Sequence, residues 1–341
     1  MKYRDNIGSH TKLAVTGSAG FIGSSLVEAL ISRGATVVAI DSLCNSSLEN
    51  IRHLLDNPNF IFVKADLKNL PDTFDVLDDC DAVFHLAANS DVRIGSFDTK
   101  IDFDNNLLAT YNLLEKVRCS KSCRKILFTS TSTVYGDATQ IPTPENYDQL
   151  IPVSLYGASK LACESLISGY SHIFGFQSAI LRLANIVGPR NYHGIIFDFV
   201  RKLCVDPNSL EVLGDGKQNK SYLYVDDCIE AILATYLSLE NNNIQIFNVG
   251  SEDKIDVFTI AHIITQEIGL DFVEIKCNCE SKDGRGWRGD VKCMLLDSSK
   301  IKGLGWKAKH NSEEAVRRTV KQILSSRLMQ IKIQKYRKSF L

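Results

Sequence analysis

The sequence has no apolar stretch that approaches the length of a membrane-spanning helix, which is about 18 residues or more. Its first twelve residues, MKYRDNIGSHTK, are polar and lack the apolar core of a signal peptide. We therefore expect a cytoplasmic protein that neither crosses nor binds a membrane.

Charge of one sign is also scarce, because the formal net charge of the 341 residues is only −1. A basic surface of the kind that binds nucleic acid is therefore not expected. The exception is a basic cluster near the end of the chain, which we interpret as a solvated terminal helix or frayed tail: Arg327, Lys332, Lys335, Arg337 and Lys338.

The ten cysteines show no framework for a metal or for disulfides. Two local pairs exist, Cys119/Cys123 and Cys277/Cys279, but neither is matched by a second pair or by histidines at zinc-site spacing. We expect reduced, mostly buried thiols and no metal site.

The residues that are present predict an α/β protein. Composition is ordinary for a globular chain, with 44% hydrophobic and 23% charged residues. Short β-branched runs alternate with helical patterns such as SSLVEALISRG, which ends on a predicted C-cap at Gly34. The expected strands are Leu13–Thr16, Thr36–Ile40, Phe60–Val63, Ala82–Leu86, Lys125–Ser130, Ser178–Leu183 and Ile244–Val249. Such alternation predicts a Rossmann-type, doubly wound parallel sheet.

After residue 187 the pattern becomes irregular and richer in turns. We expect residues 1–187 and 222–250 to form a dinucleotide-binding domain. Residues 188–221 and 251–341 are expected to form a smaller α/β lobe at the carboxyl edge of the sheet, where open α/β sheets bind ligands.

A glycine-rich loop, Gly17-Ser18-Ala19-Gly20-Phe21-Ile22-Gly23, joins the first expected strand to the first helix. Glycines at such a turn let a pyrophosphate approach backbone N–H groups at the helix N-terminus. The second strand ends at Asp41, whose carboxylate suits ribose hydroxyls and repels a 2′-phosphate. No Arg follows Asp41 directly, and this favours NAD over NADP.

The ends of the next two strands are weaker signals. Asp66 follows the third strand and could meet the adenine amino group, while the small Ala87 and Ala88 let backbone approach the dinucleotide. His85 is interpreted as a packed histidine at a strand end rather than a catalyst.

Tyr156 and Lys160 form the most informative pair, within Tyr-Gly-Ala-Ser-Lys at the start of a helical run. Four residues apart on a helix, the two side chains lie on one face. A fixed ammonium beside a phenol lowers the phenol pKa from its usual value of about 10. The pair therefore predicts a base beside a nicotinamide.

These motifs, together with HLAA, FTSTSTVYG, RLANIVGPR, KSYLYVDD and GDVKCMLLDSSKIKGLGW, resemble the extended short-chain dehydrogenase/reductase family over nearly the whole chain. Within it, DSLCNSS and STVYGD are most similar to the UDP-glucose 4-epimerase group. The resemblance implies NAD as cofactor, a UDP-sugar as substrate, and a homodimer built on the helix from about Asn105 to Val117 and on the Tyr156 helix.

The resemblance also implies roles for individual residues. Tyr156 would be the base, Lys160 its partner and ribose anchor, and Thr131 the hydroxyl that bonds the reacting sugar oxygen. The implied cofactor residues are Gly17, Gly20, Phe21, Ile22, Gly23, Asp41, Asn45, Asp66, Leu67, Leu86, Ala87, Ala88, Asn106, Thr129, Tyr156 and Lys160. The implied substrate residues are Thr131, Thr133, Asn185, Lys220, Arg285, Arg288, Asp290 and Met294.

The neighbours of Thr131 narrow the chemistry that the resemblance implies. Related 4,6-dehydratases carry Asp-Glu after the Thr, and nucleotide-sugar decarboxylases tend to have Glu at the Thr133 position, whereas this chain reads Thr131-Ser132-Thr133. Without that acid–base pair, reversible hydride transfer at the sugar C4 is expected, with Tyr156 taking the 4-hydroxyl proton and a transient 4-ketone turning over in the pocket.

The chain departs from the family at several substrate positions. Lys220 stands where an Arg often grips a phosphate, and Trp287 stands where another Arg is usual, so Arg285 or Arg288 would have to replace it. Ser90, Ala184 and Met294 do not decide which sugar the enzyme accepts. The rival interpretations are an epimerase for UDP-GlcNAc or UDP-glucuronate, a dehydratase or another enzyme of this family, or a non-catalytic NAD-binding scaffold.

Overall fold

The computed structural model describes residues 7–8, 10–71, 74–239, 244–279 and 281–325. The predicted basic tail, from Arg327 onward, lies outside the described residues, as do residues 1–6 and 9 of the polar start.

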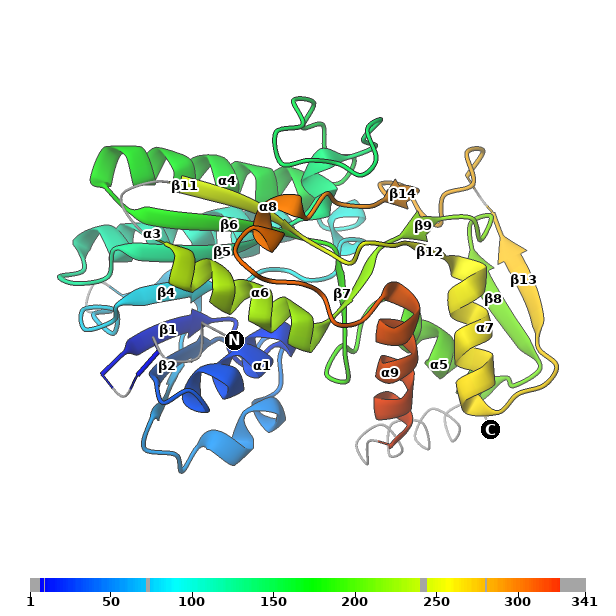
Figure 1. Ribbon diagram of the computed structural model, residues 1–341, viewed down its shortest axis with the longest axis horizontal. Helices are drawn as coiled ribbons and strands as arrows, with labels where there is room; N and C mark the ends of the chain where they lie inside the picture. The colour runs from blue at the N-terminus through cyan, green and yellow to red at the C-terminus, as the bar shows by residue number, and fades with distance from the viewer. Residues whose placement is uncertain (1–6, 9, 72–73, 240–243, 280, 326–341) are drawn as a thin grey trace.

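Seven parallel strands form a central sheet in the order β11-β6-β5-β4-β1-β2-β3 (Figure 1). They are β1 (Lys12–Thr16), β2 (Thr36–Asp41), β3 (Phe60–Lys64), β4 (Ala82–His85), β5 (Lys125–Thr131), β6 (Gln177–Leu183) and β11 (Ile244–Val249). Every strand expected from the sequence is present, with its ends shifted by at most one residue. The predicted doubly wound, parallel α/β class is confirmed.

Helices cover both faces of this sheet. Alternate strand residues face opposite sides: Leu13 and Phe84 belong to one buried cluster, and Ala14 and Val83 to another. The first cluster is covered by α1 (Phe21–Ile31) and α6 (Val225–Ser238), and the second by α3 (Ala109–Cys119) and α4 (Leu155–Phe174). Burial on both faces explains why these strands are almost continuously apolar.

Helix α1 ends in the way that its sequence predicts. Gly34 has a φ of 92°, its N–H donates to the carbonyl of Ile31, and the N–H of Ala35 donates to that of Leu30. These two bonds form a Schellman motif with glycine in the left-handed position. The turn sends the chain directly into β2.

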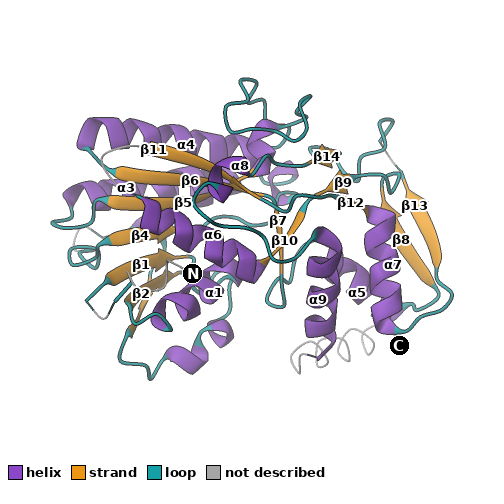
Figure 2. Cartoon of the chain, in the orientation of Figure 1, coloured by secondary structure: helices purple, strands orange, loops and turns teal. Residues whose placement is uncertain are grey.

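The smaller lobe lies beyond the sheet and contains three packed helices, α5 (Ile195–Val205), α7 (Val257–Ile268) and α9 (Ser312–Ser325) (Figure 2). Phe199, Ile260 and Val316 join these helices to the same buried cluster that covers the α1 face of the sheet. The short strands outside the central sheet are β7 (Asn185–Val187), β8 (Ser209–Leu213), β9 (Asn219–Lys220), β10 (Tyr222–Tyr224), β12 (Ile255–Asp256), β13 (Glu274–Asn278) and β14 (Cys293–Met294).

Short helices occupy the connections between these elements. They are η1 (Leu48–Asn50), η2 (Arg52–Leu54), η3 (Leu67–Asn69), η4 (Ile94–Ser96), α2 (Lys100–Asp102), η6 (Ser132–Tyr135) and α8 (Ser299–Lys302). Between α2 and α3 the chain forms a π-helix, η5 (Phe103–Leu108), and π-turns are frequent at functional sites. None of the described helices is long and apolar enough to cross a membrane.

The cysteines are thiols, as expected, but they are not mostly buried. Cys80, Cys123, Cys163 and Cys228 are buried, whereas Cys44, Cys119, Cys277 and Cys279 are exposed. The exposed ones lie in loops, at a helix end and on the edge strand β13, where no second layer covers the chain. In the described part of the chain, no group of three or more His, Cys, Asp or Glu residues is arranged to hold a metal ion.

Candidate active site

A cleft of about 990 Å³ opens between the carboxyl ends of the sheet strands and the lobe. Its walls include Asp41 at the end of β2, Thr131 at the end of β5, and Lys220 and Met294 from the lobe. This is the edge at which open α/β sheets bind ligands, and the volume is in the range of small-molecule and cofactor sites.

The cleft brings together most of the residues predicted from the sequence. Its lining contains Gly17, Gly20, Phe21, Ile22, Gly23, Asp41, Asn45, Asp66, Leu67, Leu86, Ala87, Ala88, Thr129, Thr131, Thr133, Tyr156, Lys160, Asn185, Lys220, Asp290 and Met294. Asn106, Arg285 and Arg288 are not part of it.

The glycine loop is too tight for side chains at two of its positions. Gly17 has a φ of 67°, and a Cβ there would come within 2.8 Å of the Ala87 backbone nitrogen. A Cβ on Gly23, in the first turn of α1, would collide with the carbonyl oxygen of Gly17. Backbone and helix N-terminus are thus held close together and open to the cleft, which is the geometry that a pyrophosphate needs.

Asp41 has a second role in addition to the predicted one. Its Oδ2 accepts the Ala19 N–H at 2.9 Å, and its Oδ1 accepts from the Leu43 N–H at 2.8 Å and from Ser46 Oγ at 2.7 Å. An ionised carboxylate offers about four acceptor sites. Asp41 therefore fixes the glycine loop and the loop after β2, and it keeps acceptor capacity for a further hydroxyl.

Asp66 follows β3 and His85 ends β4. Asp66 caps η3 by accepting the Lys68 N–H at 3.0 Å, and its carboxylate faces the cleft. His85 is buried, with Nδ1 2.8 Å from Thr16 Oγ1 and Nε2 2.9 Å from Thr110 Oγ1. Burial, and secondly the Lys160 charge, lower the pKa of His85 to about 3. His85 is the packed, neutral histidine that the sequence predicts.

Tyr156 and Lys160 lie on the first turns of α4, whose N-terminus is capped by Ser154 accepting the Gly157 N–H at 3.1 Å. Lys160 is 2% exposed, and its Nζ lies 4.1 Å from the centre of the Phe128 ring. Burial lowers the pKa of Lys160 to about 8. The ammonium is therefore largely retained at neutral pH, where the aromatic ring stabilises it.

The phenol of Tyr156 differs from the sequence expectation. Burial raises the pKa of Tyr156, and the charges of Asp102 and Cys163 raise it further. The loss of solvent around the phenolate disfavours its charge. In the chain alone Tyr156 is a neutral phenol, so further positive charge must come from what binds in the cleft.

Thr131 ends β5 beside this pair. Its Oγ1 lies 3.1 Å from Thr133 Oγ1 and accepts the Thr133 N–H at 3.2 Å. Both hydroxyls face the cleft, and the intervening Ser132 adds no carboxylate. This part of the cleft therefore holds hydroxyls, a phenol and an ammonium.

The lobe side of the cleft is built differently from the prediction. Lys220 Nζ lies 2.5 Å from Asp290 Oδ1, and Asn185 Nδ2 donates to the Ser221 carbonyl at 3.1 Å. Met294 is buried at the cleft wall. Lys220 is a cation at the cleft whose charge is already balanced by Asp290.

Neither predicted alternative to the missing Arg lies in the cleft. Arg285 is bidentate to Asp137, with nitrogen–oxygen distances of 3.0 and 2.8 Å, and also binds Asp283. Arg288 is exposed and outside the lining. Instead Trp287 lines the cleft, packed near Gly289. Asp137 is nearly 150 residues from Arg285 in the chain, so the sequence alone does not predict that Asp137 binds Arg285.

Asn106 is buried behind the cleft wall. Its Oδ1 accepts the Asn89 N–H at 2.8 Å, and its Nδ2 donates to Ser159 Oγ at 2.8 Å. Its neighbour Asn105 is the residue that reaches the cleft.

Sequence reasoning did not assign Arg190, Asn89 or Tyr222, although all three line the cleft. Arg190 binds Ser24 Oγ at 3.1 Å and Glu28 Oε1 at 2.6 Å, which ties its loop to α1. Arg190 ends the RLANIVGPR run and Tyr222 lies within KSYLYVDD, so the motifs were the available signal.

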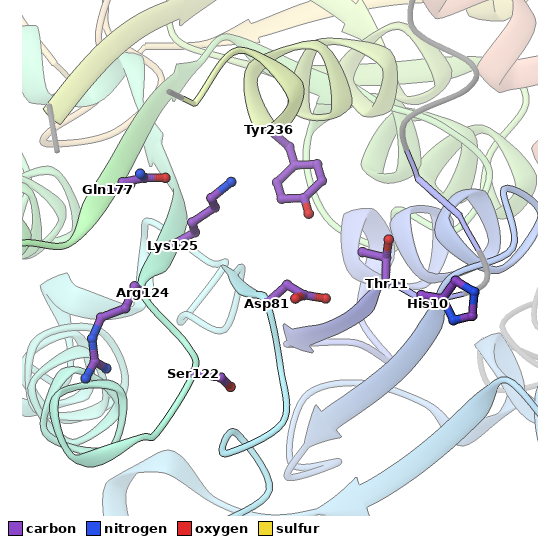
Figure 3. Close-up of a pocket in the computed structure, with 8 residues that line it drawn as sticks. All are labelled: His10, Thr11, Asp81, Ser122, Arg124, Lys125, Gln177 and Tyr236. Carbon is purple, nitrogen blue, oxygen red and sulfur yellow. The ribbon is translucent and has the colours of Figure 1, made fainter. Parts of the chain in front are cut away.

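A second, smaller cavity of about 440 Å³ lies at the opposite edge of the sheet (Figure 3). It is lined by His10, Thr11, Asp81, Ser122, Arg124, Lys125, Gln177 and Tyr236. None of the predicted site residues is among them, and Arg124 points away from its centre in Figure 3.

The comparisons with known proteins agree with this site. The family model described as "NAD dependent epimerase/dehydratase family" matches residues 13–250. A protein of Methanocaldococcus jannaschii named "Putative UDP-glucose 4-epimerase" is 33% identical over 315 residues, which cover 90% of this chain and 97% of that protein.

Solved structures give the same result. A crystal structure of a UDP-galactose 4-epimerase has a TM-score of 0.81 at 39% identity, covering 92% of this chain and 99% of the other. A UDP-glucuronic acid 4-epimerase from Bacillus cereus, solved with UDP-glucuronic acid and NAD, has a TM-score of 0.82 at 27% identity, covering 97% and 100%.

The chain belongs to the NAD-dependent epimerase/dehydratase family, and it is an enzyme of the UDP-sugar-modifying kind with NAD as its cofactor. The residues fit that cofactor. The glycine loop leaves room for a pyrophosphate, and Asp41 keeps acceptor capacity for a ribose. The side chains of Ala87 and Ala88 are small and leave the middle of the cleft open.

Proposed function

We propose that this enzyme catalyses the 4-epimerisation of a UDP-sugar of the UDP-glucose/UDP-galactose type through a transient 4-ketone. The observation that carries the proposal is the reactive end of the cleft. Tyr156, Lys160 and Thr131 line it together with the glycine loop, and Ser132 and Thr133 stand where eliminating or decarboxylating relatives are expected to carry carboxylates.

The residues divide the work as follows. NAD held by the glycine loop and Asp41 would supply a reversible hydride acceptor for the sugar carbon, so that the hydride can return to either face of that carbon. Tyr156 accepts the proton of the sugar hydroxyl and later gives it back. Thr131 Oγ1 bonds the same sugar oxygen, and the Lys160 ammonium stabilises the Tyr156 phenolate that takes up the proton. Because the pKa of Lys160 is about 8, its ammonium stabilises the phenolate at neutral pH, and this stabilisation is lost as the pH rises through about 8.

For the cofactor we propose the cleft residues Gly17, Gly20, Phe21, Ile22, Gly23, Asp41, Asn45, Asp66, Leu67, Leu86, Ala87, Ala88 and Thr129. For the nucleotide sugar we propose Thr133, Asn185, Lys220, Asp290 and Met294, with Lys220 released from Asp290 to meet the diphosphate. The cofactor domain would comprise residues 1–187 and 222–250, and the substrate lobe the remainder.

UDP-glucuronic acid is the second candidate substrate. Arg93 lines the cleft with Ser90, and its Nε lies 3.6 Å from Asp91 Oδ1, too far for a strong hydrogen bond. A guanidinium held this loosely can turn to a sugar carboxylate.

A panel of UDP-glucose, UDP-GlcNAc and UDP-glucuronate, followed by proton NMR with NAD present, tests the proposal. We expect UDP-galactose to form from UDP-glucose until an equilibrium mixture is reached. Inversion at C4 of UDP-glucuronate alone would favour the second candidate. Inversion of no sugar, with no reduction of NAD, would favour a binding scaffold and refute both.

We also propose a homodimer that uses α3, α4 and the segment before them. Large apolar side chains are exposed there: Phe97 is 91% exposed, and Phe103, Tyr111 and Leu155 are also exposed. Such a patch is characteristic of an interaction surface. Sedimentation equilibrium should give the mass of two chains, and the mass of one chain would refute the dimer. The cysteine thiols favour a reducing, cytoplasmic location.

A further inference from the structure

A buried carboxylate lies behind the reactive end of the cleft and has no role in the chemistry described so far. Asp102, the last residue of α2, is 1% exposed. Its Oδ1 accepts from Asn89 Nδ2 at 2.8 Å and from Asn106 Nδ2 at 3.4 Å. Its Oδ2 is also buried and has no hydrogen-bond partner among the described residues. Leaving a charged oxygen without a partner is costly, so a merely structural carboxylate is a poor choice here.

The surroundings of Oδ2 are closed. Gly95 approaches so closely that a Cβ there would lie 2.5 Å from Asp102 Oδ2 and 3.3 Å from the Cβ of Leu155. Asp102 is therefore wedged between the η4 turn and the first residue of the catalytic helix. A side chain at position 95 would drive these elements apart.

Hydrogen bonds connect Asp102 to the backbone of Tyr156. Asn106, which shares Asp102 Oδ1, donates to Ser159 Oγ at 2.8 Å, and Ser159 Oγ donates to the Tyr156 carbonyl at 2.8 Å. On the other side Asn89, which lines the cleft, is bound through both its backbone N–H and its side chain. The carboxylate thus joins the cleft wall to the first turn of α4.

The electrostatic relation between the two groups has a definite sign. Burial raises the pKa of Asp102, the hydrogen bonds from Asn89 and Asn106 lower it, and the carboxylates of Asp91 and Asp98, in the loops on either side of η4, raise it. The pKa of Tyr156 is raised first by burial, then by the negative charge of Asp102 and by Cys163 on α4 itself. Asp91 is paired with Arg93, and the Lys100 ammonium is directed to Asp104 rather than to Asp102.

We propose that Asp102 is a positioning residue for Tyr156. Through Asn106 and Ser159 it fixes the first turn of the catalytic helix, and its buried charge sets the pH at which the phenol loses its proton. The inference rests on the proposed role of Tyr156 as the base. It adds an acidic residue, Asp102, whose charge keeps the Tyr156 phenol protonated until the cleft is filled.

The test is Asp102→Asn in the NAD-saturated protein, because this change removes the charge and keeps the acceptor oxygen for Asn89. Tyrosinate absorbance is titrated against pH, and the same curve for Tyr156→Phe is subtracted to isolate one tyrosine. We expect the Tyr156 midpoint and the acid limb of kcat/KM to move to lower pH by roughly one unit. The matched control is Asp104→Asn, two residues away and paired with Lys100, which should leave both unchanged.

Ser159→Ala tests whether Asp102 positions the first turn of α4, and it leaves the charge of Asp102 unchanged. It should lower kcat roughly five- to tenfold, in line with one lost positioning bond, and leave the Tyr156 midpoint in place. An unmoved midpoint in Asp102→Asn refutes the electrostatic role even if the variant is less stable, and an undiminished kcat in Ser159→Ala refutes the positioning role. If the midpoint moves but the wild-type protein inverts no sugar, the inference stands and the proposed function fails.

Discussion

Tyr156→Phe should fold, bind NAD and turn over UDP-sugar about 10²- to 10⁴-fold more slowly than the wild type, which is the usual contribution of a positioned acid–base group. The aromatic ring of residue 156 is kept, whereas the phenol oxygen that would accept the sugar proton is lost. Turnover is measured by proton NMR at saturating substrate, and bound NAD by absorbance after release from the purified protein.

Tyr147→Phe is the control for this change. Tyr147 also loses a hydroxyl that is hydrogen-bonded, to Thr139, but it does not line the cleft. It should retain near wild-type turnover. Full activity in Tyr156→Phe would remove Tyr156 from the mechanism, whereas loss of NAD from that variant would mean that the substitution damages binding rather than chemistry.

The same residue marks where sequence reasoning succeeds and where it stops. Helical spacing correctly places Tyr156 and Lys160 on one face of α4, because i and i+4 are set by local geometry. The phenol pKa depends instead on burial and on Asp102, which is 54 positions earlier in the chain and carries no motif of its own. Local patterns fix what is adjacent along a helix, but not the charges that folding brings nearby.

The contrast recurs throughout the molecule. The strands and the Schellman end of α1 follow from alternation and from Gly34, both of which are local signals. Asn106 and Arg285 were expected to face ligands, but polar partners from distant segments, Ser159 and Asp137, hold them elsewhere. A polar side chain has many possible partners, and only the tertiary structure selects among them.

The support behind Thr131 and α4 is a buried ion pair that links the central strands. Arg182 on β6 and Glu164 on α4 are 3% and 5% exposed at their side chains, with Nη2 2.7 Å from Oε2. Arg182 Nη1 also donates to the Tyr135 hydroxyl at 2.9 Å, and Ser130 Oγ donates to Glu164. The pair therefore connects α4, which carries Tyr156, with Ser130, the residue before Thr131.

Arg182→Met should lower the free energy of unfolding by about 3–5 kcal/mol, because it leaves the Glu164 carboxylate buried without its counter-charge. Arg118→Met is the matched control. Arg118 binds Glu115 at the same 2.7 Å but at the surface of α3, where solvent screens the pair, so its loss should change the free energy of unfolding much less. Urea unfolding followed by circular dichroism compares the two, and equal losses would contradict the assignment of the Arg182 pair as the internal support. Helix α4 carries Tyr156, and β5 ends at Thr131. Turnover in Arg182→Met should therefore fall at lower urea concentrations than in Arg118→Met, because unfolding around the buried pair would displace both residues.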